Sequence, residues 1–413
     1  MQISKRVSEM IASPLRKFIP YAEIAKKKGI KVYHLNIGQP DLPTPKKILS
    51  AVKNFKEKVV PYTHSAGIIE LRQAWADYFA TVKIHLKPAE ILITTGGSEA
   101  MLYSLLLMLN PGEEMMVFEP FYSNYKSLAK ITGVQLVPVT VKVEENFSLP
   151  KNSEIEKKIS PKTRAILIVN PNNPTGTVYP KKDLQRIALL AKKHGLWVLA
   201  DETYREIVFE NARPASLINF KTIEKQVILI DSVSKRLSFC GGRIGCLASK
   251  NPEVIANCLK LNQSRLASPT IEQKAVIQLL SDPTKYTDGL KREYHKRSEI
   301  VYSGLQKIPG AVCRKPQGAF YIIARLPIDD SEKFVRWMLE RFSYRQETVM
   351  VAPAKDFYAT PGKGTDEVRI AYVLNTTELK KAMMILRLGI LEYQKQMPKQ
   401  MKADLCKSFS AVK

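Results

Sequence analysis

The sequence predicts an α/β fold in which a mostly parallel central sheet is sandwiched by helices. Between Ile91 and Leu247, short apolar runs typical of buried strands alternate with helical patterns, and this alternation indicates a parallel sheet with helices on both faces. The polar, glycine-rich and proline-rich segments of this region follow the apolar runs, where open α/β sheets bind ligands. With 413 residues and 45% hydrophobic content, the chain is long enough for two domains.

Charge is the one unusual feature of the composition. The net charge of +25 raises nucleic acid or an acidic membrane surface as partners. The lysines are nevertheless spread along the chain in short groups, as at 26–28 and 181–182, which favours a solvated surface. The longest nearly apolar stretch, Met101 to Leu109, is too short to span a bilayer. We expect no nucleic-acid partner and no membrane partner.

The cysteines and histidines predict neither disulfides nor a metal site. The five cysteines show no Cys-x-x-Cys spacing, and the five histidines show no metal-ligand spacing. This pattern is typical of free thiols in a reducing compartment. The N-terminus lacks the apolar core of a secretory signal, and Glu9 interrupts a weak resemblance to an organelle transit peptide. We therefore expect a cytoplasmic protein.

The strongest chemical signal follows the apolar run Val227 to Ile230. Ser232, Ser234, Lys235 and Arg243 lie in a serine- and glycine-rich segment after this run, so the expected strand presents an amine at the mouth of the sheet. A lysine attacks a carbonyl only as the neutral amine, and burial or a nearby cation lowers its pKa. Hydroxyls and a guanidinium beside that amine suit a phosphate group.

This segment, Ser-x-Ser-Lys followed by Arg-Ile-Gly, resembles the cofactor-lysine segment of the class I and II aminotransferases. These are pyridoxal-phosphate enzymes of fold type I. The resemblance extends from about Ser13 to Tyr393, with the family's motifs in order. It implies that Lys235 binds pyridoxal 5'-phosphate and that Ser232 and Arg243 contact the cofactor.

The resemblance also implies a fold type I PLP-transferase, with a smaller α+β domain built from both termini. The last third of the chain carries helical patterns at 293–305, 331–341 and 377–393, and strand-like patterns around 312, 319–323, 349–352 and 368–373. The expected divisions are residues 1–48 as the N-terminal segment of the small domain, 49–295 as the large cofactor-binding domain, 296–393 as the small C-terminal domain, and 394–413 as a basic tail.

Two N-terminal loops resemble family loops that contact ligands. The strand-like run Val32 to Ile37 leads into a turn that begins at Gly38. The corresponding family loop closes over the substrate carboxylate, which implies that Gly38 contacts substrate. Tyr62, with Gly67 after it, resembles the family's tyrosine loop. The resemblance implies that Tyr62 reaches the partner's cofactor phosphate in a homodimer with shared active sites.

Gly96, Gly97 and Ser98 lie between a strand-like run and a helical run. A strand, a glycine turn and a helix start together form an anion cradle, because the first helical N–H groups point at the charge. The third glycine of a dinucleotide fingerprint is missing. This order matches the family's phosphate-binding turn, so we expect these three residues to bind the cofactor phosphate.

Three more strand-like runs end at residues that the resemblance places around the cofactor ring. Tyr122 is expected to stack on the ring and to contact substrate. Asn173, between two prolines, is expected to donate to the ring oxygen and to contact substrate. Asp201 would keep the ring nitrogen protonated, and Tyr204 would donate to the ring oxygen. Each residue also has a purely structural alternative: Tyr122 as a core aromatic, Asn173 as part of a tight turn, and Asp201 as a helix cap.

Arg369 is the only charged residue in the alternating run Val368 to Tyr372. A strand arginine commonly faces solvent, whereas the resemblance implies a bidentate clamp on the substrate's α-carboxylate. The implied function is a pyridoxal-phosphate-dependent transaminase that moves an amino group from an L-amino acid, best aspartate, to a 2-oxo acid, best 2-oxoglutarate. The ping-pong reaction would use Lys235, Asp201 and Tyr204 as catalytic residues.

Within the family, the chain is most similar to bacterial aspartate aminotransferases of the aspartate/prephenate branch. Some members of that branch place a lysine in the phosphate turn for a side-chain carboxylate, where this chain has Ser98. Arg16 or Lys17 are the other candidates for that role. Aromatic, alanine-type or prephenate substrates remain alternatives, as do a pyridoxal-phosphate lyase or synthase of the same fold and, more remotely, a basic nucleic-acid-binding protein with an inactive enzyme fold.

Overall fold

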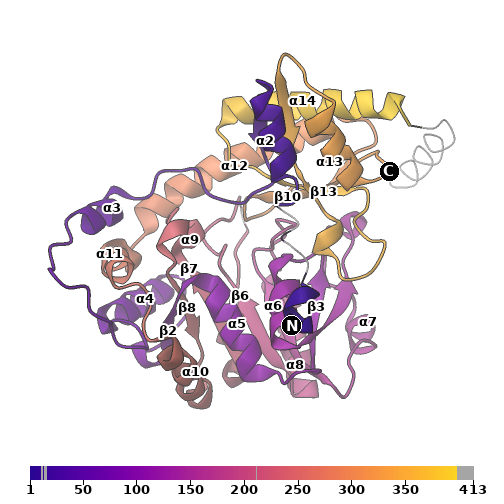
Figure 1. Ribbon diagram of the computed structural model, residues 1–413. Coiled ribbons are helices and arrows are strands. Elements are labelled where there is room, and N and C mark those ends of the chain that lie inside the picture. The colour runs from indigo at the N-terminus through magenta and orange to yellow at the C-terminus, as the bar shows by residue number, and fades with distance from the viewer. Residues whose placement is uncertain (11–12, 14–15, 211, 398–413) are drawn as a thin grey trace.

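The computed structural model describes residues 1–10, 13, 16–210 and 212–397, and it consists of a large lobe and a small lobe (Figure 1). The large lobe is built on a seven-stranded sheet. Its strands are β2 (Ile91–Thr94), β3 (Glu114–Glu119), β4 (Gln135–Thr140), β5 (Thr163–Val169), β6 (Trp197–Asp201), β7 (Val227–Ser232) and β8 (Gly245–Ala248). The strand order is β2-β8-β7-β6-β5-β3-β4. Only β8 runs antiparallel to its neighbours, which confirms the mostly parallel sheet.

Helices cover both faces of this sheet. One face packs against α5 (Gly96–Met108), α6 (Asn124–Thr132) and α10 (Pro252–Arg265). The other face packs against α3 (Lys46–Lys53), α4 (Ile69–Thr81), α7 (Asn152–Glu156), α8 (Lys181–His194) and α11 (Thr270–Leu280). The predicted arrangement of a sheet between helices is therefore confirmed.

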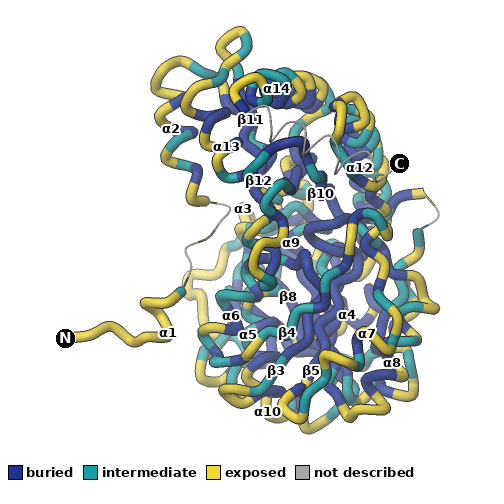
Figure 2. Tube along the Cα trace, turned by 90° about the vertical axis from the view of Figure 1, so that its right-hand side faces the viewer, coloured by how far each residue is buried: buried dark blue, intermediate teal, exposed yellow. Residues whose placement is uncertain are grey.

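Alternation within the strands divides the apolar side chains between two cores. In β5, Ile166 and Ile168 join the core under α4 and α8, whereas Leu167 joins the core under α5 and α6. The alternation follows from the two-residue period of a strand. Each fully buried aliphatic side chain contributes roughly 1.5–3 kcal/mol, so both helical layers are held firmly to the sheet. The central strands are largely buried, whereas the edge strand β4 is mostly half-buried (Figure 2).

The small lobe combines the two ends of the described chain. Its elements are α2 (Ile19–Lys27), β1 (Lys31–His34), α12 (Thr284–Gln306), β9 (Val312–Cys313), β10 (Tyr321–Arg325), α13 (Ser331–Glu340), β11 (Glu347–Met350), β12 (Ala352–Pro353), β13 (Glu367–Ala371) and α14 (Thr376–Lys395). β1 pairs in parallel with β11, and the other strands form an antiparallel sheet in the order β12-β13-β10-β9. Residues 18–35 share one core with residues 290–397, as the predicted α+β unit requires.

Two element boundaries differ from expectation. The helix expected over 293–305 begins at Thr284, after Pro283, and runs without a break past the domain boundary expected between residues 295 and 296. The helix α14 continues to Lys395, into the segment expected to be a basic tail. Residues 398–413 of that tail lie outside the described residues.

Candidate active site

A cavity of about 560 Å³ lies between the two lobes, at the C-terminal ends of β5, β6 and β7. Parallel strands bring the residues after their carboxyl ends to one edge of the sheet. Most of the residues predicted to form the site line this cavity: Gly38, Gly97, Ser98, Tyr122, Asn173, Asp201, Tyr204, Ser232, Lys235, Arg243 and Arg369. The cavity therefore brings together groups that are far apart in the sequence.

Lys235 lies in the short helix α9 (Val233–Arg236), directly after β7. Its Nζ donates to the carbonyl oxygen of Gly38 at 2.8 Å and lies 3.9 Å from Cys240 Sγ. Burial lowers the pKa of Lys235, and the charges of Arg369 and Arg243 lower it further, while Cys240 opposes them. The half-buried amine is thus shifted toward the neutral form that attacks a carbonyl.

The turn between β2 and α5 is shaped for close approach of an anion. Gly96 has φ +75°, and a Cβ placed there would lie 2.4 Å from Nη2 of Arg243, so only glycine leaves the guanidinium its place. Gly96 itself does not line the cavity, but its neighbours Gly97 and Ser98 do. Ser232 caps α9 by accepting from the Ser234 N–H at 3.2 Å. A helix start, hydroxyls and a guanidinium are the groups that suit an anion, and they meet at this end of the cavity.

Asp201 ends β6 and accepts three hydrogen bonds. The donors are the Thr203 N–H at 3.1 Å, the Thr203 hydroxyl at 2.7 Å and the Tyr125 hydroxyl at 2.7 Å. Burial raises the pKa of Asp201, and the hydrogen bonds from Thr203 and Tyr125 oppose that rise. The carboxylate is therefore fixed in orientation, with the cavity in front of it. The sequence did not point to Tyr125, whose only signal was its spacing of three residues from Tyr122.

Arg369, on β13, is only 1% exposed, so it does not face solvent as strand arginines commonly do. Its Nη1 donates to Asn173 Oδ1 at 3.1 Å and its Nη2 to the carbonyl oxygen of Asn36 at 2.6 Å. Its Nε is buried and finds no hydrogen-bond partner in the described part of the chain. A buried cation needs a compensating anion, and the cavity leaves room for one beside this guanidinium.

Two tyrosines meet beside Arg369. The hydroxyls of Tyr204 and Tyr321 lie 2.8 Å apart, and the Arg369 guanidinium lies 4.4 Å from the Tyr321 ring centre. Burial raises the pKa of Tyr204 well above its usual value. Tyr122 also lines the cavity and touches Tyr125 edge to face, with ring centres 5.6 Å apart. Tyr321 carries no recognisable motif, and sequence reasoning missed it.

Tyr62 is the one predicted site residue far from the cavity. Its side chain is 79% exposed, in the loop before α4. Arg16, by contrast, lines the cavity. The other candidate for a side-chain carboxylate, Lys17, forms ion pairs with Glu332 and Asp356 instead.

Residues 30–386 match the family described as aminotransferase class I and II. The chain belongs to this family. An aspartate aminotransferase from Pyrococcus horikoshii is 32% identical, over 92% of this chain and 95% of the relative. The aspartate/prephenate aminotransferase of Thermus thermophilus is 28% identical, over 92% and 97%. The structure of an alanine aminotransferase from Pyrococcus furiosus superimposes with a TM-score of 0.85 and 29% identity, covering 95% of this chain and all of that one.

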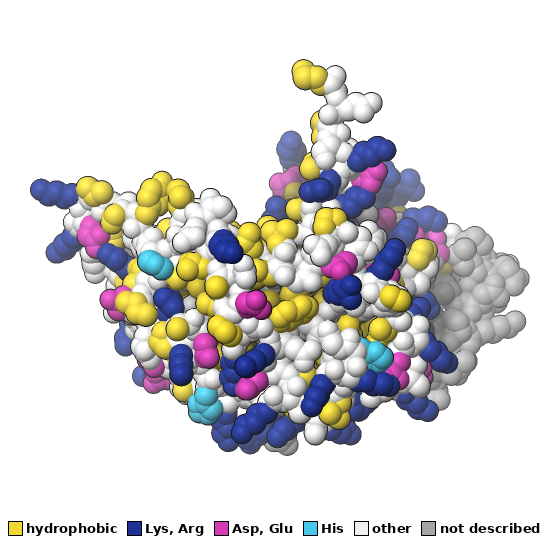
Figure 3. Space-filling model, turned by 90° about the horizontal axis from the view of Figure 1, so that it is seen from below, with side chains coloured by type: hydrophobic (Ala, Val, Ile, Leu, Met, Phe, Trp, Pro, Cys, Tyr) yellow, Lys and Arg dark blue, Asp and Glu magenta, His cyan; other side chains and the backbone are white. Residues whose placement is uncertain are grey.

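The basic residues of this aminotransferase are dispersed. Figure 3 shows lysine and arginine side chains at many places on one face, interspersed with acidic and apolar ones. Many of the described basic residues are paired, as in the contacts Arg164–Glu113 and Lys193–Glu156. Within the described residues, no helix is long and apolar enough to cross a membrane.

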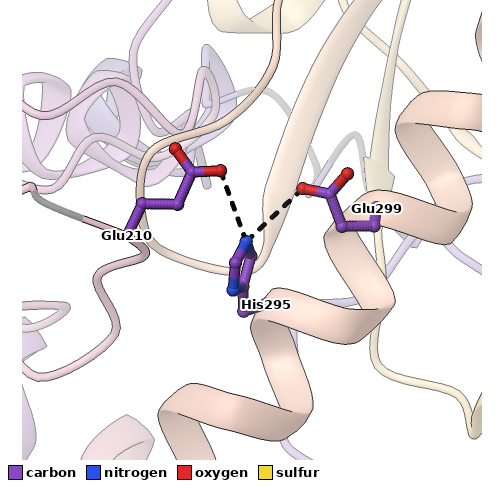
Figure 4. Close-up of side chains that lie close together, drawn as sticks. All are labelled: Glu210, His295 and Glu299. Atoms are coloured by element: carbon purple, nitrogen blue, oxygen red, sulfur yellow. Dashed lines mark ion pairs between the residues drawn. The ribbon is translucent and has the colours of Figure 1, made fainter.

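One group of possible metal ligands occurs among the described residues, outside the cavity. His295 Nε2 lies 3.6 Å from Glu210 and 3.4 Å from Glu299 (Figure 4). The ammonium of Lys315 already pairs with both carboxylates, at 2.5 and 2.9 Å. A cation is thus part of the cluster, which we interpret as a surface ion-pair group.

Proposed function

We propose that the protein is a pyridoxal-phosphate-dependent transaminase that moves the amino group of an L-amino acid, best aspartate, to a 2-oxo acid, best 2-oxoglutarate, in a ping-pong reaction. The observation that carries this proposal is that one cavity holds a half-buried amine, Lys235, and a buried guanidinium, Arg369, whose Nε lacks a partner in the described chain. An amine for the cofactor carbonyl and a cation for a carboxylate are the two ends that the reaction needs.

The chemistry of the cavity walls fits pyridoxal phosphate. The turn Gly96 to Ser98, with Ser232 and Arg243, suits the phosphate, and the close approach of Gly96 to Arg243 supports this assignment. Asp201 suits a protonated ring nitrogen. The hydroxyl of Tyr204 and the amide of Asn173 suit the ring oxygen, and Tyr122 suits the ring face, all of them lining the same cavity.

When bound, pyridoxal phosphate supplies an electron sink for the α-carbon of an amino acid. The residues of this chain do the rest. Arg369 would bind the α-carboxylate and orient the substrate, Asp201 would hold the ring-nitrogen proton, and Lys235 Nζ would take the proton from the α-carbon as general base and deliver it to the cofactor's C4′ carbon as general acid. The lowered pKa of Lys235 favours the neutral amine that the first of these transfers requires.

The preference for an acidic substrate is supported by Arg16. Its side chain lines the cavity that also holds Arg369, so two guanidiniums are available for the two carboxylates of aspartate. We expect Arg16→Met to lower kcat/KM for aspartate by at least tenfold while leaving alanine within about threefold, since one charge-assisted hydrogen bond is worth roughly 1.5–3 kcal/mol. Equal losses for both amino acids would contradict this role.

A homodimer with shared sites is supported by the surface around Tyr62. Large apolar side chains are exposed on α3, the following loop and α4: Leu49, Val52, Val59, Val60 and Ile69. Such a concentration indicates a contact surface. We propose that Tyr62 completes the partner subunit's site. The four described cysteines are free thiols, which supports a reducing, cytoplasmic location.

The test is a half-reaction screen. The purified protein loaded with pyridoxal phosphate is mixed with single amino acids and no oxo acid. A transaminase converts the bound cofactor to pyridoxamine phosphate, whereas a lyase or synthase of the same fold regenerates pyridoxal phosphate. We expect conversion with aspartate and glutamate. Conversion only with aromatic or small apolar amino acids would refute the substrate and keep the reaction; no conversion with any amino acid would refute the transaminase.

A further inference from the structure

We propose that Tyr321 is a positioning residue that couples the carboxylate clamp, Arg369, to Tyr204, so that a carboxylate bound at the clamp changes the charge stabilisation available at the cofactor's ring oxygen. The inference rests on the proposed function, because it requires pyridoxal phosphate in the cavity. It concerns a residue with no motif, on a strand of the small lobe.

Tyr321 is fully enclosed at the centre of the site. It lies on β10, is 2% exposed and lines the cavity. Its hydroxyl lies 2.8 Å from that of Tyr204, and the two rings meet edge to face at 5.6 Å. The Arg369 guanidinium lies over the ring of Tyr321, 4.4 Å from the ring centre. At this distance a cation and a ring face attract each other. Tyr321 thus touches both residues that it would couple.

The loop that contacts Lys235 also packs on this phenol. A Cβ placed at Gly38 would lie 1.7 Å from Tyr321 Oη, so the backbone of Gly38 rests directly against the hydroxyl. The carbonyl oxygen of the same glycine accepts from Lys235 Nζ. Tyr321 is therefore confined on several sides, and its hydroxyl has little freedom to turn away from Tyr204.

The direction of the hydrogen bond follows from counting protons. A tyrosine hydroxyl has one proton to donate and two lone pairs. If Tyr204 gives its proton to the ring oxygen, it can only accept from Tyr321. Tyr321 must then stay protonated. The pKa of Tyr321 is raised to about 12, chiefly by burial; Arg369 and the hydrogen bond with Tyr204 oppose the rise, and Tyr122 and Cys240 add smaller upward contributions. The phenol therefore remains a donor at neutral pH.

A chain of two donors stabilises negative charge on the ring oxygen more than Tyr204 alone, because each hydrogen bond polarises the next. Arg369 strengthens the chain by placing positive charge on the Tyr321 ring face. A carboxylate bound to Arg369 offsets that charge and weakens the donation. The oxygen then becomes more basic when substrate binds, and the pH at which the bound cofactor changes its absorbance should rise.

The test compares Tyr321→Phe with wild type, both loaded with pyridoxal phosphate, by titrating the cofactor absorbance against pH. Tyr294→Phe is the matched control: that phenol is also buried, packs on Phe320 and has no hydrogen-bond partner in the described chain. Tyr321→Phe loses the neutral hydrogen bond from Tyr321 to Tyr204, which should raise the pH midpoint of the cofactor absorbance change by about half a pH unit. The control should keep the wild-type midpoint.

The coupling is measured by repeating the titrations with saturating maleate, a dicarboxylate without an amino group. We expect maleate to raise the wild-type midpoint and to raise that of Tyr321→Phe by less than half as much. Gly38→Ala, which displaces the Tyr321 hydroxyl, should also raise the ligand-free midpoint. Midpoints and maleate shifts equal to wild type in both variants would overturn the inference. A wild-type protein that shows no bound-cofactor absorbance would refute the proposed function instead.

Discussion

Replacing Arg369 by lysine tests the proposed carboxylate clamp directly. The guanidinium is buried, donates to Asn173 and to the carbonyl of Asn36, and is sandwiched between the rings of Tyr321 at 4.4 Å and Phe357 at 5.0 Å. Lysine keeps the charge, but it loses the planar fork and the second donor that a carboxylate needs for two parallel hydrogen bonds.

The magnitude follows from the bonds lost. One charge-assisted hydrogen bond is worth roughly 1.5–3 kcal/mol, and the variant loses one such bond to the substrate together with part of its orientation. A loss of about 2–3 kcal/mol of transition-state stabilisation corresponds to about a 30- to 160-fold lower kcat/KM. Because the clamp also binds the ground state, most of this change should appear as a higher KM.

The assay is the half-reaction with aspartate, followed by rapid mixing over a range of concentrations. Arg186→Lys is the control, because Arg186 lies on α8, outside the cavity, and also forms several polar contacts, with Asn152, Asp183 and the carbonyl of Pro150. The control should react at the wild-type rate. A kcat/KM for Arg369→Lys within threefold of wild type would refute the clamp.

Three further outcomes are expected. Lys235→Ala should abolish turnover and the absorbance of covalently held cofactor, measured by spectrum and assay; retained turnover would contradict its role. Asp201→Asn should slow the half-reaction by at least about 100-fold, since a neutral amide stabilises a ring-nitrogen proton less by about 3 kcal/mol, while a smaller loss would place that proton elsewhere. Burial raises the pKa of Glu367 from 4.5 to about 7. The protonated carboxyl therefore favours the folded state, and this contribution to the free energy of unfolding is present in full below pH 4.5 and is lost as the pH rises through 7. Glu367→Gln should therefore gain about 2–3 kcal/mol of unfolding free energy relative to wild type between pH 5 and pH 8, measured by denaturant unfolding; a pH-independent difference would contradict this.

Much of the large lobe could be predicted because its signals are local. Apolar runs such as 165–169 and 227–230 have the length and the alternation of buried strands, and the groups that follow them lie at one edge because parallel strands end together. Asn173, Asp201 and Lys235 therefore line one cavity, as the sequence suggested. The antiparallel direction of β8 could not be predicted, because periodicity does not encode strand direction.

The parts that sequence reasoning missed depend on contacts between distant segments. Tyr125 and Tyr321 look like ordinary aromatic residues, and their roles follow only from the hydroxyls that they place against Asp201 and Tyr204. The environment of Arg369 is likewise tertiary, because Asn36 and Asn173 come from elements far away in the chain. Such pairings arise from the approach of two lobes and leave no spacing to recognise.

The long helix α12 has a mechanical consequence. Its 23 residues form a rod of about 35 Å, and near its start the Tyr286 hydroxyl donates at 2.9 Å to Ser238, three residues beyond Lys235. Its far end packs against α14 in the core of the small lobe. A tilt of about 5° at the anchored end displaces the far end by about 3 Å for a rod of that length. Because α12 contacts the lysine segment at one end and the core of the small lobe at the other, a slight tilt at its start would be carried along the rod to the lobe that bears Arg369.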